Sequence, residues 1–223
     1  MMTHRIAYML EKGVSPYNIL AVTFTNKAAG EMKDRIESLT GGTRGMWVMT
    51  FHAMCVRILR NHGEVLGFKN GFSIYDESDK KALLKRIVKD LKIDEKIYPV
   101  SYLGSVISSC KEAEEDPDDY IENNSMNFKA ETVAKVYARY MEDLQQNNAM
   151  DFDDLLWNVV KLFEASSEVL SYYQQRFKYI MVDEYQDTNY LQYKLIHALA
   201  EKSHNLCVVG DDDQCIYQWR GAD

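Results

Sequence analysis

Residues 180–189, IMVDEYQDTN, join a short apolar run directly to a cluster of acidic side chains. The run 179–182 has the length and composition of a buried strand, and Asp183 and Glu184 follow it at once. An unpaired buried carboxylate is costly, and such a group commonly takes up a proton instead. The acids at this strand end therefore call for a metal ion, a basic side chain or water.

Short apolar runs alternate with helical patterns in both end regions of the chain. Strands are predicted over residues 18–25, 46–51, 179–182 and 206–209. Helical patterns follow at residues 26–39, 52–67 and 191–200. Continuous apolar strands joined by helices are typical of a parallel sheet that is covered on both faces. We therefore predict an α/β fold.

The middle of the chain has a different pattern. Residues 80–91 (KKALLKRIVKDL) and 130–144 (AETVAKVYARYMEDL) are charged and amphipathic, which is typical of helices packed on one face. We therefore expect a helical subdomain over residues 73–150, inserted into an α/β domain. That α/β domain is discontinuous in sequence and consists of residues 1–72 and 151–223.

Composition indicates a soluble globular protein. The chain is 46% hydrophobic, yet it contains no apolar run of the roughly 18 residues needed to span a membrane. The start, MMTHRIAYML, lacks the apolar core of a signal peptide, and the four cysteines form no CxxC pair. We expect a cytoplasmic protein with reduced thiols. The formal charge of −8 argues against a generally basic surface, but it allows a local DNA groove.

The acids after residue 182 fit one chemistry in particular. In open α/β sheets, ligands bind at the carboxyl ends of the strands. One carboxylate there can hold the magnesium of a bound nucleotide, and a neighbouring one can orient and deprotonate the attacking water. Taken alone, however, the Asp183–Glu184 pair is a weak signal, and a solvated strand end is the simpler account of it.

A second acidic group, formed by Asp151, Asp153 and Asp154, also has two interpretations. It could form a further metal site. It could also cap a helix, because acids are favourable at the N-cap and in the first helical turn. The cap is the simpler account.

Five stretches of the sequence resemble successive motifs of the UvrD/PcrA/Rep superfamily-1 DNA helicases, and they occur in that family's order. They are ILAVTFTNKAA (19–29), TFHAMCVRILR (50–60), DFDDLL (151–156), VDEYQDTN (182–189) and VVGDDDQCIYQWRGAD (208–223). The resemblance runs from about residue 3 to residue 223, and only the helical middle matches loosely.

This resemblance implies a RecA-like P-loop NTPase-type parallel sheet with helices on both faces, interrupted by an inserted all-α subdomain. It also implies a 3′-to-5′ ATP-dependent DNA helicase that acts in repair or replication. The cofactors would be ATP and Mg²⁺, and the partners would be single-stranded and duplex DNA.

The resemblance assigns roles at the nucleotide. Asp183 corresponds to the magnesium-side carboxylate, and Glu184 to the base that activates water. Gln214 corresponds to the glutamine that contacts the terminal phosphate and reports its loss to the DNA site. Gln186 and Asp187 are similar to the family's supporting residues, which either contact the nucleotide or hold the loop.

The resemblance also assigns roles in gripping single-stranded DNA. The matching residues are Phe24, Asn26, His52, Tyr217, Trp219 and Arg220. In an extended segment, Tyr217 and Trp219 would project two rings on one side, and bases stack on such rings whatever their sequence. Outside this motif context, Phe24 and Trp219 would more often be core residues, and His52 a capping residue.

Two features depart from the family pattern. Cys215 stands where the family usually has serine, which is a small change. No GxxxxGK[ST] phosphate-binding loop occurs in the sequence, although the family has one just before THRIAYML. We therefore expect this chain to represent most of a first motor domain with its helical insertion. We also expect it to bind ATP weakly by itself.

Other functions remain open at this stage. The chain could act as a non-catalytic DNA-binding or interaction module, or it could belong to a helicase–nuclease. A metal-dependent nuclease built on the carboxylate clusters is a further alternative.

Overall fold

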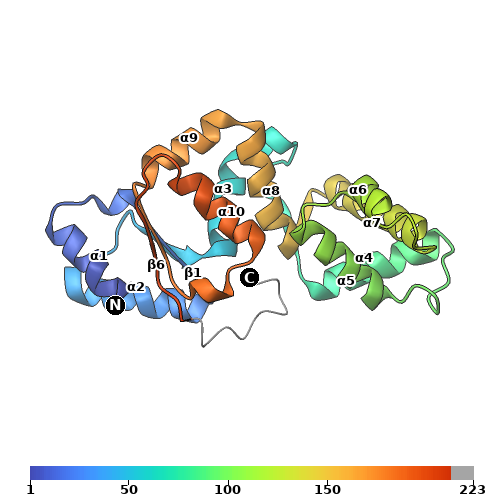
Figure 1. Ribbon diagram of the computed structural model, residues 1–223, viewed down its shortest axis with the longest axis horizontal. Coiled ribbons are helices and arrows are strands. Elements are labelled where there is room, and N and C mark those ends of the chain that lie inside the picture. Colours follow the sequence, from blue (N-terminus) through green and yellow to red (C-terminus); the bar gives the residue numbers. More distant parts are fainter. Residues whose placement is uncertain (212–223) are drawn as a thin grey trace. The chain divides into compact units, whose positions relative to one another are not determined.

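The structure is a computed structural model in which residues 1–211 are described (Figure 1). The chain divides into two compact units. We call the first, residues 1–62 and 159–223, the sheet unit, and the second, residues 63–158, the helical unit. The helical unit therefore includes more of the chain than the segment 73–150 that was expected as the insertion.

The sheet unit contains a four-stranded, wholly parallel sheet in the order β2-β1-β5-β6. Its strands are β1 (Ile19–Thr23), β2 (Trp47–Thr50), β5 (Tyr179–Val182) and β6 (Leu206–Val208). All five residues of β1 are buried, as expected for a central strand that is covered on both faces. The predicted α/β fold is confirmed.

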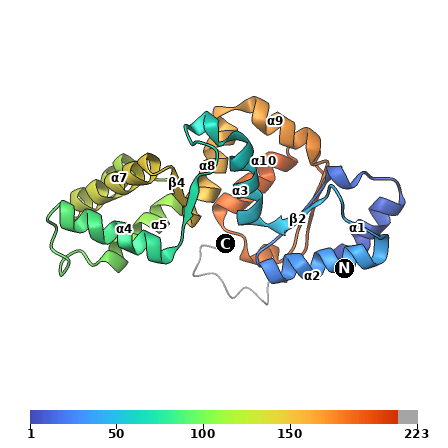
Figure 2. The ribbon, with the colours of Figure 1, turned by 180° about the vertical axis from the view of Figure 1, so that it is seen from behind.

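Helices cover both faces of this sheet (Figures 1 and 2). On one face, α1 (Met2–Glu11) and α2 (Asn26–Thr40) pack their apolar sides against β1 and β5. The other face carries α3 (Phe51–His62), α9 (Ser167–Arg176) and α10 (Tyr190–Ala200). Each face is thus shielded from water by apolar side chains.

Side-chain caps start two of these helices close behind a strand. The Thr25 side chain accepts a hydrogen bond from the Ala28 amide at the start of α2. Asn189 and Gln192 form a reciprocal capping box at the start of α10. Such caps satisfy amides that have no partner within the helix. The chain therefore turns from strand to helix within a few residues at this edge of the sheet.

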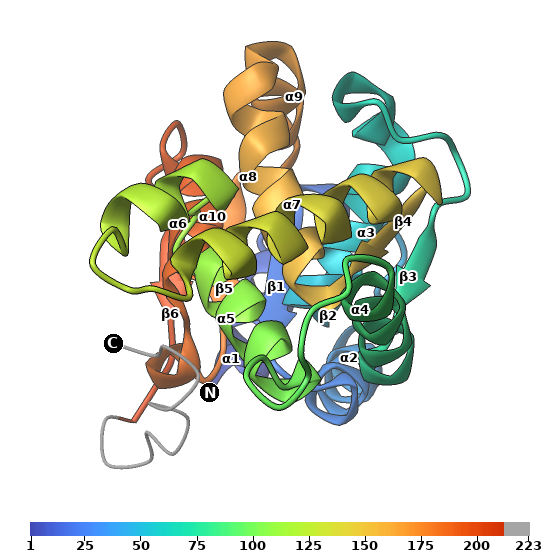
Figure 3. The same cartoon turned by 90° about the vertical axis from the view of Figure 1, so that its right-hand side faces the viewer.

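The helical unit is built from four helices and a short parallel ladder (Figure 3). Its elements are η2 (Gly63–Leu66), β3 (Ser73–Tyr75), α4 (Glu77–Asp90), α5 (Val100–Glu112), α6 (Pro117–Asn123), α7 (Ala130–Gln146) and β4 (Ala149–Asp151). The ladder between β3 and β4 was not expected from the sequence. Helix α8 (Phe152–Ala165) contains the boundary between the two units.

Within residues 1–211, no helix combines the length and apolarity that crossing a membrane would require.

Candidate functional site

The candidate site lies at the edge of the sheet where the parallel strands end, which we call the carboxyl edge. The register places Val22 opposite both Met49 and Val182, and Val182 opposite Val208. The segments that follow these four strands therefore emerge at the same edge. They contain all the predicted site residues that the structure describes, which are Phe24, Asn26, His52, Asp183, Glu184, Gln186 and Asp187.

The chain makes a sharp turn directly after β5. The Asp183 amide donates to the Val22 carbonyl oxygen (3.0 Å), and the Tyr185 amide donates to the Val209 carbonyl oxygen (2.9 Å). Between them, Glu184 has φ of 54°, in the left-handed region. A non-glycine residue is uncommon there and stores strain, which persists only where the surroundings hold it. The turn leads into the 3₁₀ helix η3 (Tyr185–Asp187).

The electrostatics of this turn favour proton uptake by Glu184. Partial burial raises the pKa of its carboxyl, and the negative charges of Asp183 and Asp187 raise it further. A carboxylate with a raised pKa is a stronger proton acceptor, as a general base needs to be. The geometry and the charge of Glu184 are thus both compatible with the role that the sequence predicted.

Asp187 lies on the same turn, and one of its carboxylate oxygens accepts no hydrogen bond from the described residues. Burial raises the pKa of its carboxyl. Its Oδ1 atom is buried and has no hydrogen-bond partner within the part of the chain that the structure describes. A buried acceptor without a partner is costly, so Asp187 is suited to meet a polar group that is not part of residues 1–211.

Gln186 connects the loops that follow β5 and β6. Its Oε1 atom accepts a hydrogen bond from the Asp211 amide (3.1 Å). A Cβ atom on Gly210 would lie 2.8 Å from that oxygen and 3.2 Å from the Gln186 nitrogen. A side chain at position 210 would therefore displace the Gln186 carboxamide and require the backbone at Gln186 to shift by a few tenths of an ångström. Sequence reasoning missed Gly210, although a glycine directly after an apolar strand is a usable signal of close backbone approach.

The three described residues assigned to DNA lie at the same edge of the sheet as this turn. Phe24 is half-buried and packs edge-to-face on Phe51, with ring centroids 5.5 Å apart. Asn26 is exposed as the first residue of α2, and His52 is half-buried at the start of α3. All three follow β1 or β2 at the carboxyl edge. Four further predicted residues, Gln214, Tyr217, Trp219 and Arg220, lie outside the described residues, as does Cys215.

The acids of the 151–156 motif form a helix cap. Asp154 N donates to Asp151 Oδ1 (2.9 Å), and Asp151 N donates to Asp154 Oδ2 (3.0 Å), at the start of α8. The predicted cap is thus confirmed. Among residues 1–211, no group of three or more His, Cys, Asp or Glu side chains is arranged to hold a metal ion.

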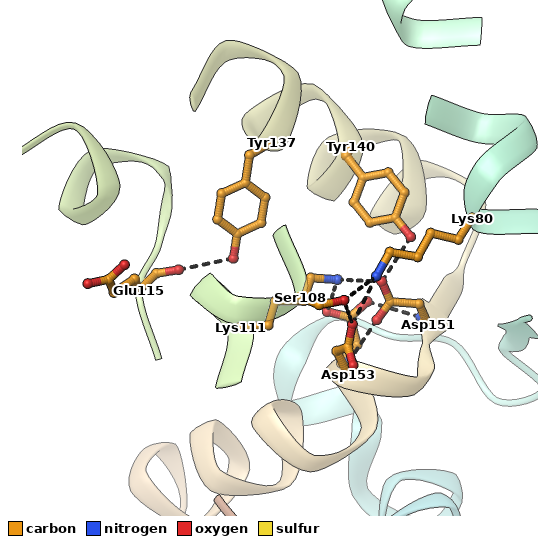
Figure 4. A network of polar contacts seen from close by, with 9 residues as sticks. Lys80, Ser108, Lys111, Glu115, Tyr137, Tyr140, Asp151 and Asp153 are labelled. Carbon is orange, nitrogen blue, oxygen red and sulfur yellow. Dashed lines mark hydrogen bonds and ion pairs between the residues drawn. The ribbon is translucent and has the colours of Figure 1, made fainter. Parts of the chain in front are cut away.

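A buried lysine pairs with both capping acids, and Figure 4 labels it together with Asp151. Lys111 Nζ lies 2.8 Å from Asp151 Oδ2 and 2.7 Å from Asp154 Oδ1, and its side chain is entirely buried. Burial by itself raises the pKa of both carboxyls. The lysine charge nevertheless lowers the pKa of Asp151 to about 2, whereas burial and the Asp151 charge raise that of Asp154 to about 6.

Neighbouring polar groups extend this cluster. Tyr140 donates to Asp151 Oδ2 (2.8 Å), and Lys80 Nζ contacts both Ser108 Oγ (2.6 Å) and Asp153 Oδ2 (3.0 Å). Sequence reasoning identified only the three aspartates of this network, because their partners lie far away along the chain.

A wholly parallel sheet flanked by helices, with an acid pair at its carboxyl edge, is consistent with a RecA-like helicase domain. Residues 1–223 match the family model described as the UvrD/REP helicase N-terminal domain. The chain belongs to this family.

Relatives in staphylococci carry a more specific description. The chain is 50% identical over 225 aligned residues to the protein named ATP-dependent DNA helicase PcrA of Staphylococcus aureus (strain Mu50 / ATCC 700699). It is 51% identical to the PcrA protein of Staphylococcus epidermidis (strain ATCC 12228 / FDA PCI 1200). These alignments cover 100% of the chain but only 30% and 31% of the relatives. The chain thus spans about a third of the length of the relatives it matches.

Proposed function

We propose that the complete protein is an ATP-dependent DNA helicase that moves 3′-to-5′ along single-stranded DNA and unwinds duplex DNA in repair or replication. The residues of this chain would supply the acid pair for the magnesium-bound nucleotide and part of the DNA grip. The turn after β5 is the observation that carries the proposal. It holds Asp183 and a strained Glu184 at the carboxyl edge, beside the segments that follow β1 and β2.

Asp183 fits the protein ligand of a magnesium ion. It is half-buried directly after β5, and it forms no ion pair within residues 1–211. Magnesium usually takes one or two carboxylates, with substrate phosphates and water as its other ligands. When bound, the ion would neutralise charge on the transferred phosphate.

Glu184 would accept the proton of the attacking water. Its raised pKa favours that step, and its strained backbone requires support from the surrounding turn. Gln186 would keep the loop after β6 in place through the Asp211 amide, and Asp187 would present its unpaired oxygen toward the same ligand. Gln214 would report loss of the terminal phosphate to the DNA site.

Phe24, Asn26 and His52 would contact single-stranded DNA from the ends of β1 and β2, together with Tyr217, Trp219 and Arg220. The half-buried position of Phe24 supports this role, because part of its ring remains accessible. Bases of any sequence can stack on such a ring.

The proposal is tested by unwinding of partial duplexes with the complete protein. We expect strand separation of duplexes that carry a 3′ single-stranded tail, and only when ATP and magnesium are present. Duplexes with a 5′ tail are the control for polarity. Efficient unwinding from the 5′ tail would contradict the proposed direction, and unwinding without nucleotide would contradict the motor itself.

Replacing Phe24 tests the DNA grip. In the complete protein, Phe24→Leu should weaken single-stranded DNA binding by about 1–3 kcal/mol, because a leucine offers no ring for stacking. Leucine keeps an apolar contact to Phe51, so the fold should tolerate the change. The loss should be similar for oligonucleotides of different base sequence, as measured by fluorescence titration.

Tyr172→Leu is the matched control, because this exposed tyrosine lies on α9, which leads into the opposite end of β5. Thermal melting of both variants separates binding from stability. Unchanged DNA affinity in a well-folded Phe24→Leu variant would mean that Phe24 serves packing only.

A further inference from the structure

The outer edge of the sheet carries a second surface that the proposed motor does not use. A groove of about 600 Å³ runs along β2, and we call it the β2-edge groove. The side chains that matter here come from α2, from the loop 41–45, from β2 and from α3. They are Lys33, Glu37, Arg44, Val48, Met49 and Arg57.

The backbone of β2 is open on the side of this groove. Within residues 1–211, β2 pairs with β1 alone and is therefore an edge strand. An edge strand presents unpaired N–H and C=O groups that can pair with another chain. Val48 and Met49 are only half-buried, whereas strands of a parallel sheet are usually covered. The edge thus offers both hydrogen-bond groups and apolar contact.

The rim of the groove is positively charged. Lys33, Arg44 and Arg57 are all exposed, and none of them forms an ion pair with any described residue. Arg57 lies over the ring of buried Trp47, 4.3 Å from its centroid, which restricts the position of its guanidinium. In a chain with a net charge of −8, three unpaired cations in one groove favour an acidic ligand.

The loop that carries Arg44 is held in place by its backbone. Gly41 and Gly45 have φ of 78° and 93°, in the region that favours glycine. Buried Thr43 donates to Glu37 Oε1 (2.8 Å), which ties the loop to the end of α2. Glu37 is the one acid among the described residues that line the groove. The rim is therefore largely formed before any ligand binds.

We propose that the β2-edge groove binds an extended, acidic segment of a partner protein, which adds to the sheet as a strand beside β2. Main-chain hydrogen bonds would provide affinity, and the cations would select acidic side chains. A nucleic acid fits less well, because a sugar–phosphate backbone lacks the alternating N–H and C=O groups that a strand edge pairs with. In the described part of the chain, no aromatic ring lines the groove for base stacking.

Peptide binding to the complete protein tests this proposal. The probe is a fluorescein-labelled peptide of alternating glutamate and valine, followed by anisotropy. We expect it to bind at least about tenfold more tightly than the matching lysine–valine peptide, because charge pairs across an interface set selectivity. Methylating alternate backbone nitrogens of the probe should also weaken binding about tenfold or more, since it removes the N–H donors.

Variants locate the site. Lys33→Glu combined with Arg44→Glu should weaken binding of the glutamate–valine peptide by about tenfold or more. Lys27→Glu combined with Arg35→Glu is the matched control, because it makes the same charge change on α2 outside the groove lining. The control should stay within about twofold of the parent, and melting curves should show that both variants fold.

Four results would overturn the proposal. They are no peptide binding, equal binding of the N-methylated probe, equal effects of the two double variants, and displacement of the peptide by a single-stranded oligonucleotide whose own binding requires Lys33 and Arg44. The last result would make the groove a nucleic-acid site.

Discussion

Replacing Glu184 by glutamine in the complete protein is expected to lower the DNA-stimulated ATPase rate by about 100- to 10,000-fold. The amide has the same size and can occupy the same left-handed backbone position, but it cannot accept the proton of the attacking water. Nucleotide affinity should therefore hardly change. Steady-state hydrolysis with single-stranded DNA measures the rate, and isothermal titration with Mg–ATP measures the affinity.

Glu201→Gln provides the control. It removes the same charge, but from an exposed residue at the end of α10. Its rate should equal that of the parent protein. If Glu184→Gln kept more than about a third of the parent rate, far above the range for loss of a general base, the catalytic role assigned to Glu184 would be wrong.

A second large effect is expected in the helical unit, where Lys111→Met should lower the free energy of unfolding by about 3–5 kcal/mol. Methionine fills a similar volume but carries no charge. The substitution would leave Asp151 and Asp154 facing each other, both buried, without the cation that lies within 2.8 Å of each. Urea denaturation followed by circular dichroism measures the loss.

Arg86→Ala is the comparison for this variant. Its guanidinium is more than half exposed, and the carboxylate it contacts, Asp143, retains Arg139 as a partner at 2.7 Å. Asp143 itself is buried, but because it keeps Arg139 and loses only an exposed partner, the removal should cost less than about 1 kcal/mol. Equal losses for the two variants would show that Lys111 contributes no more to stability than a half-exposed arginine whose carboxylate keeps a second partner.

The alternation of strands and helices could be predicted because it is a local pattern. Short apolar runs mark the strands, and their alternation with helices along the chain then implies parallel pairing. The cap formed by Asp151 and Asp154 is equally local, since the two residues lie three apart. The short ladder between β3 and β4 was missed because its strands have only three residues each and lie far apart in sequence.

The acids of the candidate site could also be predicted, because they directly follow a strand. The sequence could not indicate what lies around them. The left-handed backbone of Glu184 and the close approach of Gly210 to Gln186 both depend on how two loops meet in space. Lys111 is separated from Asp151 by 40 residues. The sequence therefore gives no sign that this lysine contacts the aspartates of the 151–156 motif.

The burial of Lys111 has a consequence for the chemical reactivity of the protein. Burial by itself lowers the pKa of its amine, but the two flanking carboxylates raise it above the ordinary value. The amine is thus both inaccessible and held in its protonated, non-nucleophilic form. Acylating reagents that modify exposed lysines such as Lys33 should leave Lys111 untouched while the helical unit is folded. Labelling of this one amine would therefore report each opening of the helical unit.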